Sequence, residues 1–348
     1  MKRILIIASA LLCLVSCGRT VATAKHEADK LSFDAWIHVQ KEQHPEYLWK
    51  QTELGSWLLE EEIGNGDIIT GDEDTLYVSV DYTIRNTSGT ITATTLEKVA
   101  QQLGTYSEAS YYGPTVLYYG GSYAGIEELL KGMRVGGRRM AAIPGWILTY
   151  KRYDSPEKYL NDSTSNSPAV YDVRLTDKFR STKEWEIDSI SRYLVRNFPS
   201  QFGSNPVTAR ADSAGAHGFY YVRLSGPVIS DELSDTTVYI NYTGRLLNGM
   251  VFDTTIRDTA IYHGIYSSSR TYSPVSITYG SSWSDIKMGS DNSSVKEGFA
   301  RILTKMRAQE RGVGIFYSGL GYGSSGSGSS IPGYSPLCFE IQLVNKPE

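Results

Sequence analysis

A glycine-rich stretch near the C-terminus has the spacing of a phosphate-binding loop. Gly321, Gly323 and Gly326 form a GxGxxG pattern. In dinucleotide-binding proteins this pattern leaves a strand, opens a helix and meets an acidic residue about 20 positions later. Here it runs into a serine-glycine stretch and then Ile331-Pro332, where no helix would begin. Residues 337–344, which follow, have the pattern of a strand. The sequence therefore argues against a nucleotide site, and the glycines need another explanation.

The cysteines, histidines and net charge exclude other kinds of chemistry. The five histidines are scattered, and none has metal-ligand spacing to a cysteine or to another histidine. We therefore expect no metal site. Of the three cysteines, Cys338 lies in an alternating strand sequence, where a small structural residue is expected rather than a nucleophile. A net charge of −4 gives no basic surface for nucleic acid.

The N-terminus has the pattern of an export signal. Lys2-Arg3 precede an apolar run, residues 4–15, that is too short to span a bilayer. The run ends in Leu14-Val15-Ser16-Cys17, which resembles the lipobox of bacterial lipoproteins. The resemblance implies lipidation of Cys17 and a membrane anchor in the bacterial cell envelope, on the periplasmic side or at the outer membrane. The alternative is a plain secretory signal with an incidental cysteine.

The remaining chain contains a repeat. Its 348 residues are 41% hydrophobic and 21% charged, enough for two globular domains, and 25 tyrosines favour β-rich structure. The segments LGSWLLEEEIGNGD, DTLYVSVDYTIRN and AGIEELLKGMR recur in the same order as HGFYYVRLSG, TTVYINYTGRLLNG and VKEGFARILTKMR. In this alignment Tyr82-Thr83 matches Tyr242-Thr243. One unit is therefore used twice.

Each copy has the pattern of an antiparallel sheet with one short helix. In the second copy Val238, Ile240 and Tyr242 alternate as in a half-buried strand, and Asn248-Gly249 predicts a two-residue hairpin turn. Ser294 with Glu297 predicts a capping box at the start of a helix. The apolar stripe of that helix consists of Val295, Phe299, Ile302, Leu303 and Met306. The predicted fold class is α+β.

The predicted organisation places helical segments before each sheet unit. Short helices are expected within Phe33 to Leu48 and within Lys183 to Phe198. The predicted parts are a signal peptide (1–17), an N-terminal helical segment (18–54), a first domain (55–180), a helical linker (181–216) and a second domain (217–348).

The second copy resembles the FKBP-type peptidyl-prolyl cis-trans isomerase family over most of Phe219 to Val344. The resemblance is carried by YTGRLLNGMVFD, the helix beginning at Val295, GLGYG with its serine-glycine loop, and IPGYSPLCFEIQL. It implies two FKBP-like domains, and it explains the glycines as a flexible loop on the rim of a proline pocket. It also implies isomerase activity without a cofactor, on proline-containing polypeptides.

Carried over position by position, the resemblance implies a set of site residues. The implied catalytic positions are Tyr242, Phe252, Asp253, Phe299, Tyr322 and Phe339. The implied substrate-binding positions are Val275, Ile277, Val295, Lys296 and Ile331. Phe299 stands where the family usually has tryptophan, Lys296 where it usually has isoleucine, and Ser327 and Ser330 replace bulkier loop residues. A strict two-residue hairpin would place Phe252 on the other face of the sheet from Tyr242, so a bulge or a strong twist is needed to bring both to one pocket.

The implied chemistry needs aromatic residues and few charges. Rotating an X–Pro bond removes amide resonance, with a barrier of roughly 18–20 kcal/mol. An apolar pocket that favours the twisted amide lowers this barrier by differential binding. The Tyr322 hydroxyl and the Lys296 N–H would fix the peptide carbonyls. Asp253 would hold a neighbouring group in place rather than act as a base.

The first copy departs from the family at the pocket. Thr92-Ala93 replace Phe252-Asp253 and Ile126 replaces Phe299, whereas Tyr171 keeps the aromatic residue of the last strand. We expect a degenerate domain without activity, serving in packing or dimerisation, although the oligomeric state is open. The leading hypothesis is an anchored isomerase that assists the folding of exported proteins. The alternatives are a non-catalytic peptide-binding or assembly lipoprotein and a structural lipoprotein that keeps the fold as an interaction surface.

Overall fold

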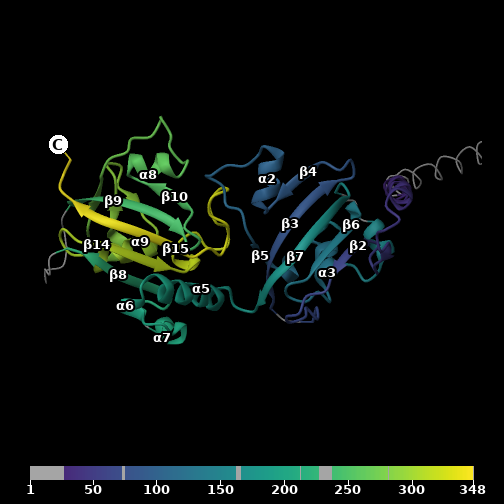
Figure 1. The fold of residues 1–348 in the computed structure, drawn as a ribbon, viewed down its shortest axis with the longest axis horizontal. Helices are drawn as coiled ribbons and strands as arrows, with labels where there is room; N and C mark the ends of the chain where they lie inside the picture. The colour runs from purple at the N-terminus through teal and green to yellow at the C-terminus, as the bar shows by residue number, and fades with distance from the viewer. Residues whose placement is uncertain are drawn as a thin grey trace, which may run out of the picture. The chain divides into compact units, whose positions relative to one another are not determined.

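The two sheets that the apolar alternation predicts form two compact units. The computed structural model describes residues 27–72, 75–161, 166–211, 213–226, 237–280 and 282–347, so the predicted signal segment and Cys17 lie outside the described residues. One unit comprises Met1–Val99 and Gly113–Arg180, and the other Ala100–Tyr112 and Ser181–Glu348 (Figure 1). In the described ranges no helix is both long and apolar enough to cross a membrane.

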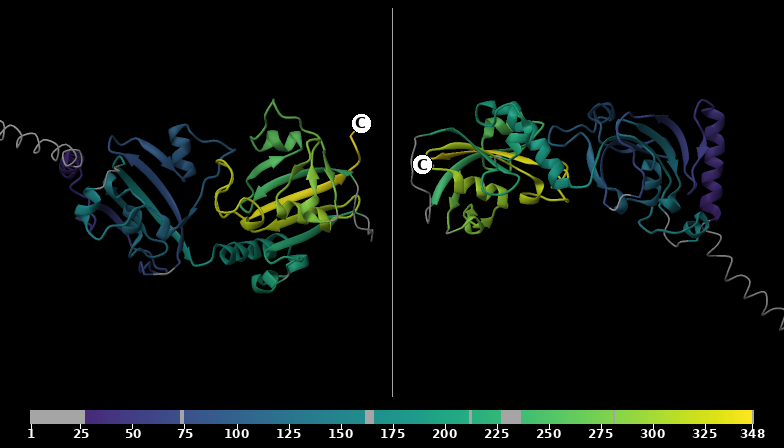
Figure 2. Two further views of the ribbon diagram at one scale, coloured as in Figure 1. Left: turned by 180° about the vertical axis from the view of Figure 1, so that it is seen from behind. Right: turned by 90° about the horizontal axis from the view of Figure 1, so that it is seen from below.

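The first unit is a seven-stranded antiparallel sheet. Its order is β1 (Lys50–Gln51), β2 (Trp57–Glu62), β6 (Arg138–Ile143), β7 (Ala169–Phe179), β3 (Tyr77–Asn86) and β4 (Ile91–Thr94), and β5 (Thr115–Tyr118) also pairs with β3. Helix α3 (Ala124–Leu130) buries Leu129 and Leu130 in the core. Residues 27–43, purple in Figure 2, form a helix that adds Phe33 and Ile37 to the same core. Shorter helical elements of this unit are η1 (Tyr119–Gly121), η2 (Gly145–Ile147) and α4 (Pro156–Leu160), and α2 (Glu97–Leu103) spans the division between Val99 and Ala100.

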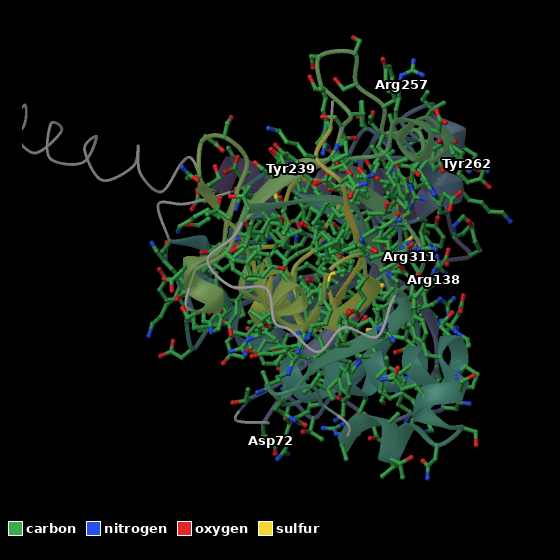
Figure 3. The ribbon with its side chains drawn as sticks, turned by 90° about the vertical axis from the view of Figure 1, so that its left-hand side faces the viewer. Asp72, Arg138, Tyr239, Arg257, Tyr262 and Arg311 are labelled. Carbon is green, nitrogen blue, oxygen red and sulfur yellow. The ribbon has the colours of Figure 1, made fainter. Side chains whose placement is uncertain are left out.

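The second unit is an eight-stranded antiparallel sheet. Its order is β13 (Ser293–Ser294), β12 (Lys287–Met288), β11 (Val275–Thr278), β9 (Thr237–Leu246), β15 (Leu337–Val344), β14 (Arg311–Phe316) and β8 (Phe219–Ser225), and β10 (Val251–Thr254) pairs with β9. Helix α9 (Glu297–Lys305) buries Phe299, Ile302 and Leu303 against the sheet. The remaining short elements are α8 (Arg257–Tyr262), η3 (Trp283–Asp285) and η4 (Ser318–Leu320). Arg257 and Tyr262 of α8 stand at the outer edge of Figure 3, and Tyr262 is 83% exposed.

The predicted repeat is confirmed by strand order and by hydrogen bonds. The order β2-β6-β7-β3 in one unit matches β8-β14-β15-β9 in the other. The Thr95 hydroxyl accepts a hydrogen bond from the Tyr82 N–H at 2.9 Å, and the Thr255 hydroxyl accepts one from the Tyr242 N–H at 3.0 Å. A second hydroxyl pair, Thr83 with Thr94, recurs as Thr243 with Thr254. The α+β fold class, with one short helix on each antiparallel sheet, is therefore confirmed.

The helices expected before each sheet are present, with different limits. The first covers residues 27–43 rather than beginning near Phe33. The second is α5 (Thr182–Asn197), whose N-cap, Ser181, accepts a hydrogen bond from the Glu184 N–H. It is followed by α6 (Pro199–Phe202) and α7 (Pro206–Ala211), and Arg210 of α7 pairs with Glu184 and Asp188 of α5.

The predicted capping box on the core helix of the second unit is wrong. The N-cap of α9 is Lys296, and its side chain makes no capping hydrogen bond. Ser294 belongs to β13 instead, and its hydroxyl accepts a hydrogen bond from Lys287 Nζ at 2.9 Å. Ser294 is therefore part of a paired strand, three residues before the helix begins at Glu297.

Candidate functional site

A cavity of about 390 Å³ in the second unit gathers most of the predicted site residues. Its walls come from β9, β10, β12, β13, the start of α9, the glycine-rich loop and β15. The lining residues are Tyr242, Phe252, Asp253, Met288, Ser294, Val295, Lys296, Phe299, Tyr322 and Phe339. The structure thus brings together residues that lie nearly 100 positions apart in the sequence.

Phe339 is the centre of an aromatic cluster in this cavity. Its ring centroid lies 5.1 Å from that of Phe299 and 5.5 Å from that of Phe252, both in edge-to-face geometry. Tyr242 meets Phe299 edge to face at 5.5 Å. Edge-to-face pairs place the positive edge of one ring against the negative face of the next, which fixes ring orientation as well as excluding water. The result is a rigid apolar floor.

The hairpin between β9 and β10 delivers Phe252 and Asp253 by means of a bulge. Val251 pairs with Arg245 and Asp253 pairs with Gly244, so Phe252 is an extra residue in its strand. A bulge of this kind turns the strand and re-aims its side chains. It is the irregularity that the sequence requires if Phe252 and Tyr242 are to share one pocket, and both line the cavity.

The predicted two-residue turn in that hairpin is wrong. The Leu246 N–H donates to the Met250 carbonyl and the Gly249 N–H donates to the Leu246 carbonyl, which leaves three residues in the turn. Gly249 has φ of +94°, a left-handed value that glycine adopts without a steric penalty. The loop is therefore the three-residue type in which glycine follows the turn.

Gly244 provides the space for two of the rings. A Cβ atom at this position would lie 2.6 Å from Phe339 Cε1 and 2.7 Å from Phe252 Cε2. Real Cβ atoms essentially never approach other heavy atoms below 3.0 Å. Any other residue at position 244 would therefore push the rings out of place.

Asp253 is held by two partners. It accepts a hydrogen bond from the Tyr242 hydroxyl at 2.6 Å and forms an ion pair with Arg270. Burial, followed by the negative charge of Asp253, raises the pKa of Tyr242, so this hydroxyl stays protonated and donates. The carboxylate of Asp253 is therefore held in place by two contacts, and Arg270 compensates its charge.

Arg270 contacts the site through Asp253, and the sequence motifs did not predict it. It lies in the loop after α8 and its guanidinium carbon is 5.4 Å from the ring centre of Tyr272. The repeat could have drawn attention to this loop, because the loop containing Ser267 and Tyr272 matches the one containing Ser107 and Tyr112. In both loops the tyrosine hydroxyl accepts a hydrogen bond from the serine N–H. The arginine is specific to the second copy.

Tyr322 and Lys296 face each other across the rim. Lys296 Nζ lies 4.7 Å from the ring centre of Tyr322, a cation–π distance. Burial, and then the charge of Asp253, raise the pKa of the Tyr322 hydroxyl, which keeps it a hydrogen-bond donor at neutral pH. Lys296 is the N-cap of α9, and the first N–H groups of a helix have no partner within the helix. The rim thus offers a hydroxyl and backbone donors above an aromatic floor.

The sequence comparison with known families gives a match that includes all the residues lining this cavity. Residues 231–344 match the family model described as FKBP-type peptidyl-prolyl cis-trans isomerase. The matched residues lie within the second unit, which is called the FKBP-type unit below. None of the curated proteins matches the chain.

Solved structures similar to this chain include FKBP proteins. The three FKBP domains of wheat FKBP73 are 16% identical, with a TM-score of 0.28, and the comparison covers 82% of this chain and 93% of that one. FkpA from Escherichia coli is 22% identical, with a TM-score of 0.30, over 50% of this chain and 72% of that one. A peptidyl-prolyl cis-trans isomerase from Pseudomonas syringae pv. tomato is 21% identical, with a TM-score of 0.27, over 45% and 92%.

Three predicted substrate-binding residues of the FKBP-type unit do not line the described cavity. Ile277 is 0% exposed and Ile331 is 3% exposed, both in the core. Val275, on the same strand as Ile277, packs partly buried against that core. Met288 and Ser294 take part in the lining instead. They belong to the short strands β12 and β13, in the long segment between Asp253 and Val295 for which the sequence offered no motif.

The first unit lacks the space that Gly244 leaves for the pocket rings of the second unit. Ile84 pairs with Tyr171 where Gly244 pairs with Phe339 in the second unit. An isoleucine side chain thus stands where a single Cβ would already collide with the pocket rings. Thr92 and Ala93 also supply neither ring nor carboxylate. Cavities of about 320 and 400 Å³ do occur in this unit around Trp36, so volume alone does not identify a site.

The remaining nucleophile and metal candidates have structural explanations. Cys338 is 2% exposed, and burial raises the pKa of its thiol to about 11, so it is not a thiolate at neutral pH. Among the residues that the structure describes, no group of three or more His, Cys, Asp or Glu side chains could hold a metal ion.

Proposed function

We propose that this chain is a peptidyl-prolyl cis-trans isomerase and that the FKBP-type unit carries the activity. The observation that supports it most is the joint placement of Phe252, Phe299 and Phe339 around one cavity, with Tyr322 at its rim. A generic core does not require these residues to meet at an opening to solvent.

In the proposed mechanism the proline ring enters the aromatic pocket and the preceding amide lies at the rim. The twisted amide has lost its resonance and is less polar than the planar ground state, so an apolar, water-excluding pocket binds it better. That difference in binding lowers the rotation barrier, and no covalent intermediate is needed. The Tyr322 hydroxyl and the N–H of Lys296 would hold the flanking carbonyls while the bond turns.

Asp253 has a supporting role in this mechanism. Its charge is compensated by Arg270 and by the Tyr242 hydroxyl. An uncompensated carboxylate at the edge of the pocket would attract water toward the amide, whereas a neutralised one keeps the rim polar but ordered. Asp253 would therefore orient the wall of the pocket without taking a proton.

We also propose that the protein is anchored in the cell envelope and assists exported proteins in folding. Support comes from the apolar run that ends at Cys17, which resembles a lipoprotein signal. Several acyl chains on one cysteine would give firm anchoring, where a single chain gives only marginal binding. Exported proteins with X–Pro bonds in the wrong isomer would then be the substrates, because uncatalysed isomerisation takes tens to hundreds of seconds.

The test is an isomerisation assay of the full chain on a proline tetrapeptide. We expect turnover by the native protein and, in a folded Phe252→Ala variant, a loss of more than tenfold, because the ring that excludes water from the amide is removed. Phe202→Ala is the matched control: Phe202 lies in the same unit, in a separate cluster with Tyr220. Peptide binding without turnover by the native protein would refute the isomerase proposal and select a non-catalytic peptide-binding protein.

A further inference from the structure

A buried carboxylate on α5 contacts the turn that leads to Tyr322. Glu186 lies on this helix, ahead of the FKBP-matched residues 231–344, and is 1% exposed. It precedes Ile190 by four residues and Leu194 by eight, on the face of α5 that packs into the unit. Burying a carboxylate is costly unless hydrogen bonds replace its water. The Glu186 carboxylate therefore needs hydrogen-bond donors, and Ser318 supplies two of them.

Ser318 donates a hydrogen bond to each carboxylate oxygen of Glu186. The Ser318 N–H donates to Glu186 Oε2 at 2.5 Å and the Ser318 hydroxyl donates to Oε1 at 2.7 Å. Ser318 is 4% exposed and is the first residue of η4. The side chain of Glu186 therefore fixes the start of this turn from a position 132 residues earlier in the chain.

Ser318 in turn fixes the backbone on both sides of Tyr322. Its carbonyl accepts hydrogen bonds from the N–H groups of Gly321 and Gly323, both at 2.8 Å. The carbonyl of Gly323 accepts a further bond from the Tyr334 N–H at 2.9 Å. Without these bonds, two glycines beside the tyrosine would leave its backbone unusually free.

We propose that Glu186 is a positioning residue for Tyr322, acting through Ser318 to hold the tyrosine at the rim of the pocket. The proposal rests on the proposed isomerase function for its catalytic consequence, but the structural link can be measured without turnover. If the proposal holds, α5 contributes to catalysis although it lies outside the residues that match the family.

The protonation state of Glu186 is compatible with a glutamine replacement. Burial raises the pKa of the carboxyl group to about 7, against the hydrogen bonds from Ser318, which lower it. A neutral carboxyl group and a glutamine amide have the same shape and can both serve Ser318. The amide oxygen would accept from the Ser318 N–H, and the amide N–H would donate to the Ser318 hydroxyl.

The test compares four variants in the full chain. Glu186→Ala removes both bonds, Ser318→Ala removes only the hydroxyl bond, and Glu186→Gln keeps both. Glu184→Ala is the matched control, because Glu184 is on the same helix but its side chain is 47% exposed and pairs with Arg210. Ser318→Ala keeps the proposal falsifiable if Glu186→Ala does not fold.

The first readout is hydrogen–deuterium exchange at the amides of Gly321 and Gly323. We expect exchange about tenfold faster in Glu186→Ala, a smaller increase in Ser318→Ala, and rates near those of the native protein in Glu186→Gln and Glu184→Ala. Exchange within β9 should not change. Unchanged exchange at both glycines in folded Glu186→Ala and Ser318→Ala would overturn the proposal.

The second readout is a double-mutant cycle with Tyr322→Phe on peptide isomerisation. If Glu186 acts through the tyrosine, its alanine variant should lower kcat by about the same factor as Tyr322→Phe, and the double variant should be no slower than the slower single variant. If the double variant instead lowers kcat by the product of the two single-variant factors, Glu186 does not act on catalysis through Tyr322. Faster glycine exchange in a protein that turns over no peptide even in its native form would support the link and refute the isomerase function.

Discussion

Replacing Gly244 by alanine is the most direct test of the pocket geometry. The new Cβ would stand 2.6 Å from Phe339 Cε1 and 2.7 Å from Phe252 Cε2, where ordinary contacts are 3.4–4 Å. The rings must therefore move by on the order of 1 Å, and both belong to a packed edge-to-face cluster. Gly244 is not among the positive-φ glycines, so alanine meets no backbone strain there and the collision is the whole perturbation.

We expect a modest loss of stability and a larger loss of activity in Gly244→Ala. Overpacking a core costs about 1–3 kcal/mol, and the reduced freedom of the unfolded chain returns roughly 0.4–1 kcal/mol of it. A misplacement of about 1 Å at reacting groups can lower the rate by about 100-fold. The measurements are the free energy of unfolding in urea and kcat/KM on a proline tetrapeptide.

The matched control for this prediction is Gly249→Asn in the adjoining turn. Gly249 has φ of +94° with nothing within 4 Å of its Cβ position, and asparagine tolerates left-handed backbone better than most residues. It should keep kcat/KM within a few-fold of the native value. Full activity in a folded Gly244→Ala protein would refute the reasoning, because it would show that catalysis does not depend on where these rings lie.

Two further expectations concern the rim and the anchor. Tyr322→Phe should lower kcat/KM on the same peptide by at most about tenfold, since one hydrogen bond contributes on the order of 0.5–1.5 kcal/mol; an unchanged value would remove the hydroxyl from the mechanism. Cys17→Ser should leave the protein soluble or unprocessed in membrane fractionation, and a processed variant that stays in the membrane pellet would contradict the lipid anchor.

Periodicity and motif order were sufficient for the sheets and for most of the pocket. The strand Leu337–Val344 was predicted with its observed limits, because alternation of buried and exposed residues is strong there. The hairpin was harder. Asn248-Gly249 suits a two-residue turn, yet a three-residue turn followed by a bulge at Phe252 uses the same residues, and the local sequence does not distinguish between the two.

The residues that sequence reasoning missed depend on contacts between distant segments. Arg270, Met288 and Ser294 lie in the long segment between β10 and α9, where no motif guided the alignment. Glu186 did carry a local signal, since it falls on the apolar face of an amphipathic helix where a carboxylate is unexpected. Its partner, however, lies 132 positions away, and nothing in the sequence connects them.

The burial of Glu186 also predicts how stability depends on pH. Burial raises the pKa of its carboxyl group to about 7 in the folded protein, against 4.5 for an unperturbed glutamate, despite the opposing hydrogen bonds from Ser318. The folded state therefore binds this proton more tightly than the unfolded state does. The contribution is fully present below about pH 4.5, where both states are protonated, and it is lost as pH rises through about 7. At 1.36 kcal/mol per pKa unit the loss is on the order of 3 kcal/mol.

Glu186→Gln should remove this pH dependence. Glutamine stays neutral, so the difference in unfolding free energy between variant and native protein should grow in favour of the variant between about pH 4.5 and 7. Urea unfolding at several pH values measures it. A difference that stays flat across this range would mean that Glu186 is ionised in the folded protein, and that Ser318 compensates its charge more completely than burial opposes it.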